Sequence, residues 1–133
     1  MSVVVAENGQ GRYQQAVTVG QHQLIADEPV SMGGANAGPA PFDFIMAGLG
    51  ACTSMTLRMY AERKGLALTR INVALNHEKV EVDGVPRDCI ERTISIEGEL
   101  TAEQRQRLLE IANKCPVHRA LSQSLDIAST LAT

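Results

Sequence analysis

The sequence predicts an α+β fold: an antiparallel β-sheet combined with one long central helix. Three observations lead to this prediction. Short alternating segments separated by glycine-containing turns fill the first 26 residues, and an apolar stretch with helical spacing follows at residues 42–64. Two longer alternating segments and two helical segments come after it. A chain of 133 residues is expected to form one domain, residues 1–133.

Three short strands are expected near the start of the chain, at residues 3–6, 13–19 and 22–26. Turn-forming residues separate them, with Gly9 and Gly11 in the first gap and Gly20 in the second. Close spacing and short turns predict an antiparallel meander. Residues 27–41 are rich in Gly and Pro and predict a long loop, of a length that is often functional.

A long helix is expected over residues 42–64. Its apolar side chains recur on one stripe, formed by Ile45, Leu49, Cys52, Met55 and Met59. The first three turns are apolar on almost every side, which predicts a helix that is buried all round. Gly48 and Gly50 each disfavour the helix by about 1 kcal/mol relative to Ala. We therefore expect another element to cross very close to these two glycines.

The second half of the chain predicts a hairpin and two helices. Alternation favours strands at residues 70–80 and 89–97, with a turn region at 82–86. Arg92 falls on the apolar face of the second strand and therefore needs a partner. Thr101 and Gln104 form a capping box that starts a helix running to about residue 114. Pro116 fits the first position of a short helix to about residue 124, and residues 125–128 are a candidate last strand.

Composition and charge exclude several classes of function. The formal net charge is −3 and no basic stripe is present, so neither nucleic acid nor an anionic membrane is an expected partner. The longest apolar run is too short to span a bilayer. The first residues show no basic segment followed by a hydrophobic one, so a cytoplasmic protein is expected. Aromatic residues make up only 3%, and such a core is expected to need a partner subunit.

The three cysteines are too widely spaced for a disulfide scaffold. A metal site is not expected, because the Cys115 and His118 spacing has no matching second pair, and no cofactor is expected either. No local signature supports a Cys-His hydrolase, and residues 33–38 lack the lysine of a phosphate-binding loop.

Two of the cysteines have surroundings that favour chemistry. Cys52 lies in the uncharged helix among the hydroxyls of Thr53, Ser54 and Thr56, with Arg58 less than two turns further on. The alternative is that Cys52 is only a small buried hydrophobic residue.

Cys115 is expected at the N-cap of the helix that starts at Pro116, where the helix dipole favours a thiolate. His118 and Arg119 follow within one turn as further cationic neighbours. The alternative is a buried cap. Cys89 is expected at the start of a strand, and its role stays open.

Two cysteine-containing motifs are specific enough to compare with known families. The matching residues are Gly33-Gly34, Gly38-Pro39-Ala40-Pro41, Ala47-Gly48-Leu49-Gly50-Ala51-Cys52-Thr53, Met55-Thr56-Leu57-Arg58-Met59-Tyr60-Ala61 and Leu108-Leu109-Glu110-Ile111-Ala112-Asn113-Lys114-Cys115-Pro116-Val117-His118. They resemble the OsmC/Ohr family, and most closely a less characterised branch of it. Together with the order of the elements, the resemblance covers nearly the whole chain.

The resemblance implies an OsmC-like fold and an intertwined homodimer in which β-sheets enclose long central helices. It also implies a thiol-dependent peroxidase that reduces hydroperoxides, preferably organic ones, in oxidative or osmotic stress defence. By this resemblance Cys52 is the peroxidatic cysteine and forms a sulfenic acid. Cys115 is the resolving cysteine, and an external dithiol reduces the resulting disulfide.

One departure from the family concerns the activation of the thiol. Well-studied members pair an arginine of the N-terminal region with a glutamate at the start of the central helix. Here Phe42 stands at the glutamate position with Asp43 next to it, and no arginine lies between Arg12 and Arg58. Either one of three arginines, Arg12, Arg92 or Arg119, replaces the missing one in space, or the thiol is less activated.

Two other interpretations stay open, and the departure motivates the first of them. In the first, the chain is a non-peroxidatic OsmC-like protein that binds a hydrophobic ligand or senses redox state. In the second, both cysteines are packing residues only.

Overall fold

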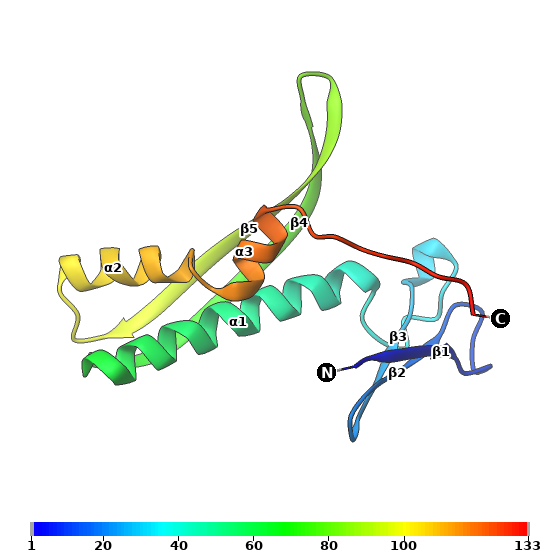
Figure 1. Cartoon of the computed structure of the whole chain (residues 1–133), viewed down its shortest axis with the longest axis horizontal. Helices are drawn as coiled ribbons and strands as arrows, with labels where there is room; N and C mark the ends of the chain where they lie inside the picture. Colours follow the sequence, from blue (N-terminus) through cyan, green and yellow to red (C-terminus); the bar gives the residue numbers. More distant parts are fainter. Residues whose placement is uncertain (1, 133) are drawn as a thin grey trace. The chain divides into compact units, whose positions relative to one another are not determined.

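The structure is a computed structural model that describes residues 2–132 (Figure 1). The chain begins with a three-stranded antiparallel sheet, formed by β1 (Val4–Glu7), β2 (Gln15–Val19) and β3 (His22–Ala26). Val19 pairs with His22, so the two residues between them form a tight turn. Gly20 supplies the positive φ of 59° that this turn requires. The expected meander is confirmed, although β2 begins two residues later than the alternation predicts.

Contacts divide the chain into two units, one ending at Ala47 and the other beginning at Gly48, and each is described by itself. In the first unit, the loop after β3 is organised around the buried carboxylate of Asp27. Its Oδ1 accepts the N–H of Glu28 at 2.8 Å, and its Oδ2 accepts those of Ala35 and Ala37 at 3.1 and 3.0 Å. The bond from Ala37 is the main cause that lowers the pKa of Asp27, against the opposing effect of burial. The loop is therefore an ordered structure, with one short 3₁₀ turn, η1 (Val30–Met32).

The long helix α1 (Pro41–Lys64) confirms the central prediction of the sequence. At its start, Asp43 Oδ2 accepts the N–H of Ala40 at 2.9 Å, and an acidic group there suits the helix dipole. At its end, Gly65 adopts a φ of 65°, as a left-handed helix C-cap requires.

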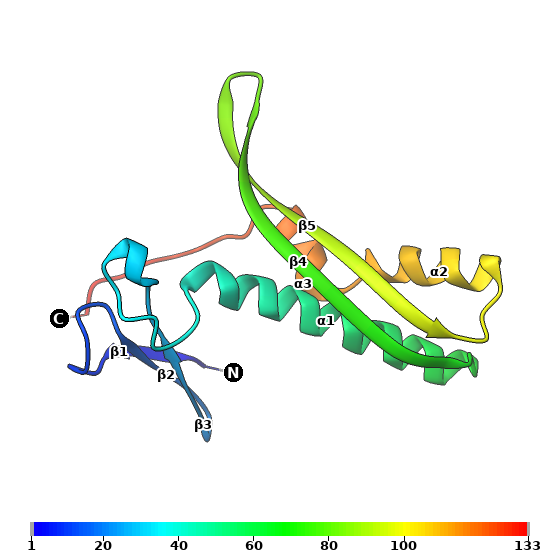
Figure 2. The same ribbon diagram turned by 180° about the vertical axis from the view of Figure 1, so that it is seen from behind.

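In the second unit a long antiparallel hairpin of β4 (Leu68–Val82) and β5 (Val85–Gly98) supports the helices. Asp83 and Gly84 both have positive φ, 52° and 76°, which is the geometry of a two-residue hairpin turn. The strands are longer than the sequence predicts because this turn needs only two residues. Figure 2 shows the hairpin crossing in front of α1 and α2 (Ala102–Ala112), so both helices lie on the same face of it.

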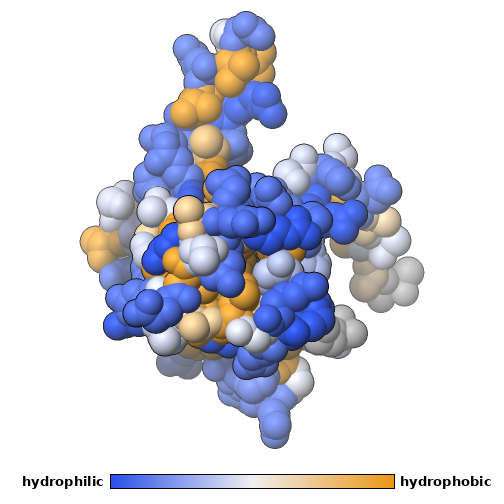
Figure 3. Space-filling view, turned by 90° about the vertical axis from the view of Figure 1, so that its left-hand side faces the viewer, coloured by the Kyte–Doolittle hydropathy of each residue, from blue (hydrophilic) through white to orange (hydrophobic). Residues whose placement is uncertain are grey.

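A small aliphatic core lies between these two helices and the hairpin. Its buried members are Leu57, Ala61, Leu68, Leu108, Ile111 and Ala112. The predicted capping box holds the start of α2: Gln104 N–H donates to Thr101 Oγ1 at 3.0 Å, and Thr101 N–H donates to Gln104 Oε1 at 2.9 Å. In the space-filling view of Figure 3, apolar side chains gather in the middle of the face and hydrophilic ones surround them.

The predicted apolar stripe of α1 is wrong in its position. The buried residues of the helix are Leu49, Gly50, Thr53, Leu57 and Ala61. Of the predicted stripe, only Leu49 is buried, whereas Met55 and Met59 are 59% and 64% exposed. The helix is apolar on more than one side, and in the described chain only one side is covered. One chain alone therefore does not bury the helix all round.

Two further expectations need correction. A Cβ added to Gly50 would lie 2.8 Å from Leu75 Cδ1, so β4 does cross closely there, but Gly48 has nothing within 4 Å of that position. The chain continues beyond α3 (Pro116–Ser122) without regular structure, so residues 125–128 are not a strand. Leu125 and Ile127 are exposed there, because no strand of the described residues pairs with this segment.

None of the helices in the described residues is both long enough and apolar enough to cross a membrane.

Candidate functional site

Cys115 lies where α2 has ended and α3 begins, and it is completely buried. Its backbone is extended, with φ of −64° and ψ of 139°, as expected for an N-cap residue. Its Sγ accepts a hydrogen bond from the backbone N–H of His118 at 3.3 Å. The predicted N-cap position of Cys115 is therefore confirmed, and the cap bond is made by sulfur.

The side chain that faces Cys115 across the core is Thr53, the residue that follows Cys52 on α1. Thr53 is fully buried, and its Oγ1 lies 3.9 Å from Cys115 Sγ. The single hydroxyl proton of Thr53 is donated to the carbonyl of Leu49 at 2.7 Å. Thr53 Oγ1 can therefore only accept in its contact with Cys115, and the thiol is the donor.

Arg92 connects this contact to the end of α2. Its Nη1 donates to Thr53 Oγ1 at 2.9 Å and to the carbonyl of Ala112 at 3.3 Å, and its Nη2 donates to Asn113 Oδ1 at 2.9 Å. The prediction that Arg92 needs a partner on the apolar face of its strand is confirmed. No carboxylate takes part, because the side-chain ion pairs of residues 2–132 lie elsewhere. From the sequence, Thr53 was noted only as one of the hydroxyls around Cys52, and Asn113 was not singled out.

The other two thiols are free and half-buried. Cys52 precedes Thr53, so about 100° of helix rotation separates their side chains. The structure thus brings Cys115 to the neighbour of Cys52 and forms no disulfide. Cys89 lies on β5 opposite Glu78, and strand alternation places it on the face opposite to Arg92. Cys89 is therefore not part of the cluster of Thr53, Arg92, Asn113 and Cys115, which we call the Cys115 cluster.

The remaining arginines considered in the sequence lie in other surroundings. In the first unit, the Arg12 guanidinium lies 4.9 Å from the centre of the Tyr13 ring. Arg119 is exposed on α3, and its backbone N–H donates to the carbonyl of Cys115 at 3.0 Å. Arg58 donates to the carbonyl of Leu68 at 2.6 Å, so its guanidinium serves the start of β4. Within the second unit, Arg92 reaches the Cys115 cluster with its side chain, whereas the side chain of Arg58 bonds elsewhere and Arg119 is exposed.

His118 is half-buried next to the cluster. Burial lowers the pKa of its imidazole below the ordinary 6.5, and the positive charge of Arg92 lowers it further. Both effects disfavour the charged imidazole that the sequence suggested as a cationic neighbour of Cys115. His118 contributes its backbone N–H instead.

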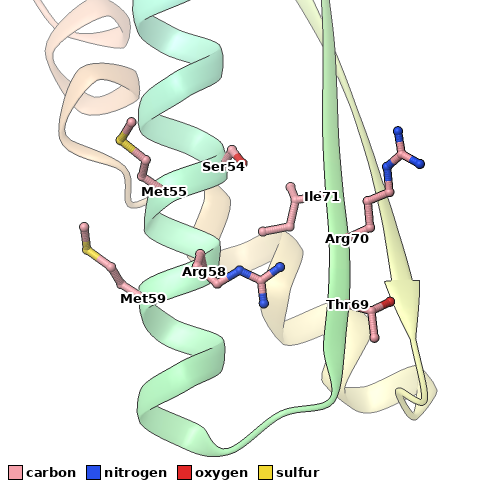
Figure 4. A pocket seen from close by; sticks show the side chains of 7 residues that line it. All are labelled: Ser54, Met55, Arg58, Met59, Thr69, Arg70 and Ile71. Carbon is pink, nitrogen blue, oxygen red and sulfur yellow. The ribbon is translucent and has the colours of Figure 1, made fainter.

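Two hollows of the second unit are lined by residues of α1, and Cys52 lines neither of them. One, of about 240 Å³, is lined by three apolar side chains, Leu49, Ile90 and Leu121, and by the polar side chains of Asp88, His118 and Ser122. The other, of about 420 Å³, runs along α1 beside the first residues of β4 (Figure 4). Figure 4 shows Ile71 pointing toward α1 and Arg70 pointing away from it. Within residues 2–132, no group of three or more His, Cys, Asp and Glu side chains is placed to hold a metal ion.

Several solved structures share this fold. An OsmC-like protein from Mycoplasma pneumoniae superimposes with a TM-score of 0.77 at 17% identity, covering 91% of this chain and 86% of that one. An organic hydroperoxide resistance protein, OsmC, from Legionella pneumophila gives 0.68 at 19% identity, with 91% and 89% covered. An organic hydroperoxide resistance protein from Elizabethkingia anophelis gives 0.66 at 23% identity, with 89% and 84% covered.

These identities are low, so the likeness to the solved structures shows the fold. A comparison with curated protein sequences found no match. The model of one protein family, described as OsmC-like protein, matches residues 33–130, which include both Cys52 and Cys115. The chain belongs to the OsmC family.

Proposed function

We propose that this chain is a thiol-dependent peroxidase that reduces organic hydroperoxides, with Cys52 as the peroxidatic and Cys115 as the resolving cysteine. The observation that carries the proposal is the unequal burial of the two thiols. Cys52 is half-buried, so a peroxide can reach it, whereas Cys115 is 0% exposed. A thiol buried in this way is poorly reached by a peroxide from solution, which suits a resolving cysteine better than a peroxidatic one.

The proposed reaction needs no metal or cofactor. The Cys52 thiolate attacks the terminal oxygen of the peroxide, the O–O bond breaks, and the alkoxide leaves and takes up a proton to become an alcohol. The sulfenic acid of Cys52 then condenses with the Cys115 thiol, which forms the disulfide and releases water. An external dithiol reduces the disulfide by exchange and is itself oxidised.

Two findings support organic peroxides as the substrate class. The similar folds from Legionella pneumophila and Elizabethkingia anophelis are described as organic hydroperoxide resistance proteins. In this chain, the hollow that includes His118 also has apolar walls from Leu49, Ile90 and Leu121. An alkyl or aryl group would displace water from such a surface, whereas hydrogen peroxide would gain nothing from it.

The proposal includes a homodimer acting in the cytoplasm as part of oxidative or osmotic stress defence. The uncovered side of α1, which exposes Met55 and Met59, supports a second copy as the partner. Large apolar side chains are rarely left exposed together on the main helix of a small domain, because the free energy gained by burying their apolar surface is then lost.

A second candidate is an OsmC-like protein that binds a hydrophobic ligand or senses redox state without turnover. The hollow of about 420 Å³ favours it, because Met55, Met59 and Ile71 give it an apolar lining. Asp43 also favours this candidate. It stands beside the position where the family has its thiol-activating glutamate, but its carboxylate accepts the N–H of Ala40 at the start of α1.

The test is turnover of cumene hydroperoxide and hydrogen peroxide, with dithiothreitol or a lipoyl dithiol as the donor. Replacing the nucleophile, Cys52→Ser, is expected to lower turnover by about three orders of magnitude or more. Cys89→Ser is the matched control and should keep turnover, because Cys89 lies on the opposite face of β5 from Arg92. Full turnover in Cys52→Ser would remove Cys52 from the proposed role. No turnover in the wild type, with saturable binding of an apolar probe, would favour the second candidate.

A further inference from the structure

Arg92 is half-buried on β5, and its guanidinium has partners from two other parts of the chain. One guanidinium binds α1 at Thr53, the last carbonyl of α2 at Ala112, and the side chain of Asn113. These three acceptors come from segments 39, 20 and 21 residues away in the sequence. All three acceptors are neutral, so the charge of Arg92 strengthens these hydrogen bonds without forming an ion pair.

The three acceptors surround Cys115 in a particular way. Thr53 is the residue after Cys52, and its Oγ1 touches Cys115 Sγ. Ala112 and Asn113 are the residues from which the chain turns toward Cys115. Arg92 thus fixes the distance between the turn of α1 that carries Cys52 and the junction that carries Cys115.

Disulfide formation depends on that distance. Cys115 Sγ must leave Thr53 Oγ1 and approach Cys52 Sγ, and the Cα atoms of a disulfide lie within about 7 Å of each other. In this step the S–H of Cys115 and the S–OH of Cys52 are lost, one S–S bond forms, and water leaves. Attack on the peroxide, in contrast, involves Cys52 alone.

We propose that Arg92 is a positioning residue for the resolving step: its hydrogen bonds to Thr53, Ala112 and Asn113 hold Cys115 beside the turn of α1 that carries Cys52. This inference rests on the proposed function. It assigns Arg92 to Cys115 and not to activation of Cys52. Asn113 accepts one of these hydrogen bonds and therefore contributes to the same positioning of Cys115.

The experiment follows one turnover step by step in Arg92→Met, Arg92→Lys and wild type. Reduced protein receives one equivalent of cumene hydroperoxide and is quenched at intervals, and mass spectrometry measures Cys52 sulfenic acid, trapped with dimedone, and the disulfide. In Arg92→Met, sulfenic acid formation is expected to stay within about twofold of wild type, and disulfide formation to slow by about tenfold or more, as loss of charge-assisted hydrogen bonds predicts. Arg92→Lys should recover part of the rate, because an ammonium keeps the charge and loses the planar fork.

Two other variants keep the test decisive. Arg87→Met, an exposed position on the same strand, should leave both steps unchanged. If Arg92→Met does not fold, Asn113→Ala removes one acceptor and should slow only the disulfide step, by a few-fold. An unchanged disulfide rate, or an equal slowing of both steps, would overturn the inference, because the first would show no positioning and the second a general loss of structure.

A separate readout distinguishes failure of the inference from failure of the proposed function. If the wild type forms neither sulfenic acid nor disulfide, the proposed peroxidase is wrong. The positioning of Cys115 is then measured by its alkylation with iodoacetamide, which is slow in the wild type because the side chain is buried. Faster alkylation by about tenfold in Arg92→Met but not in Arg87→Met supports the positioning role. Equal rates would overturn it.

Discussion

Thr53 is a buried hydroxyl whose two strongest hydrogen bonds do not involve Cys115. It donates to Leu49 and accepts from Arg92, so both bonds persist whatever Cys115 does. Its contact with Cys115 is the weakest of the three, at 3.9 Å to sulfur. If Cys115 leaves to form a disulfide, Thr53 is still satisfied, and a buried polar atom without a partner is the costly case. The site therefore tolerates the loss of this contact.

His118 gives the site a dependence on pH. Burial first, and then the charge of Arg92, lower the pKa of its imidazole in the folded chain, whereas the unfolded value is about 6.5. The unfolded state therefore binds more protons as the pH falls below 6.5, and the folded state loses stability as the pH falls through the lowered pKa.

This prediction is checked by urea unfolding between pH 7.5 and 5.5. The wild type should lose free energy of unfolding on acidification, and His118→Gln should lose less, because its side chain cannot take up a proton. Comparing the two variants isolates the contribution of His118, because every other side chain is the same in both. Identical pH profiles would show that the imidazole of His118 is not held neutral by the fold.

At the scale of single residues, the sequence predicted features that depend on neighbouring positions well and contacts between distant segments poorly. The N-cap position of Cys115 follows from Pro116, and the need of Arg92 for a partner follows from its place on an apolar face. Both are local patterns, and both are confirmed. Thr53 and Asn113 could not be chosen as those partners, because three elements must pack before they meet.

At the scale of elements, the loop between β3 and α1 depends on close backbone contacts. A Cβ on Gly38 would collide with the carbonyl group of Ile25, and one on Gly34 with the backbone of Glu28. These glycines therefore allow the loop to fold back on β3 and on Asp27, which receives three backbone N–H groups. Their presence in the family motif has a structural reason in this chain.

Gly38→Ala is expected to lower the free energy of unfolding by about 1–3 kcal/mol, the usual cost of forcing extra atoms into a packed site. Ser31→Ala, at an exposed position of η1, is the control and should change it by less than about 0.5 kcal/mol. Urea titration followed by circular dichroism measures both. Equal stability of Gly38→Ala and wild type would mean that the loop moves away from Ile25 without cost.

The type and order of most elements were predictable from periodicity, turn residues and caps, as α1, the hairpin and the capping box of α2 show. The buried side of α1 was not. Because this helix is apolar on several sides, its pattern does not select one face, and the contact with β4 at Gly50 selects it only after folding.

At the scale of the whole molecule, the single chain leaves a great deal of apolar surface uncovered. Met55 and Met59 of α1 are 59% and 64% exposed, and Ile127 after α3 is 83% exposed. Composition alone predicted this shortage, since a chain with 3% aromatic residues and many glycines has little apolar area per residue. Which surface a partner would cover depends on the folded shape and could not be inferred from the sequence.

We expect light scattering to give twice the mass of one chain, with the Met55 and Met59 side of α1 in the interface. A double variant, Met55→Glu and Met59→Glu, places two charges where a stable dimer would bury its core, and it should dissociate into monomers. Leu109→Glu is the matched control, because Leu109 is also exposed, at 50%, but lies on α2. It should remain a dimer.

A wild type of single-chain mass would contradict the homodimer, and it would also change the choice between the two proposed functions. Met55 and Met59 line the hollow of about 420 Å³, so a partner packed on them would occupy the space that an apolar ligand needs. A monomer with this hollow open would favour the ligand-binding candidate. A dimer that dissociates only in the double variant would leave the peroxidase as the function that both the thiols and the uncovered helix support.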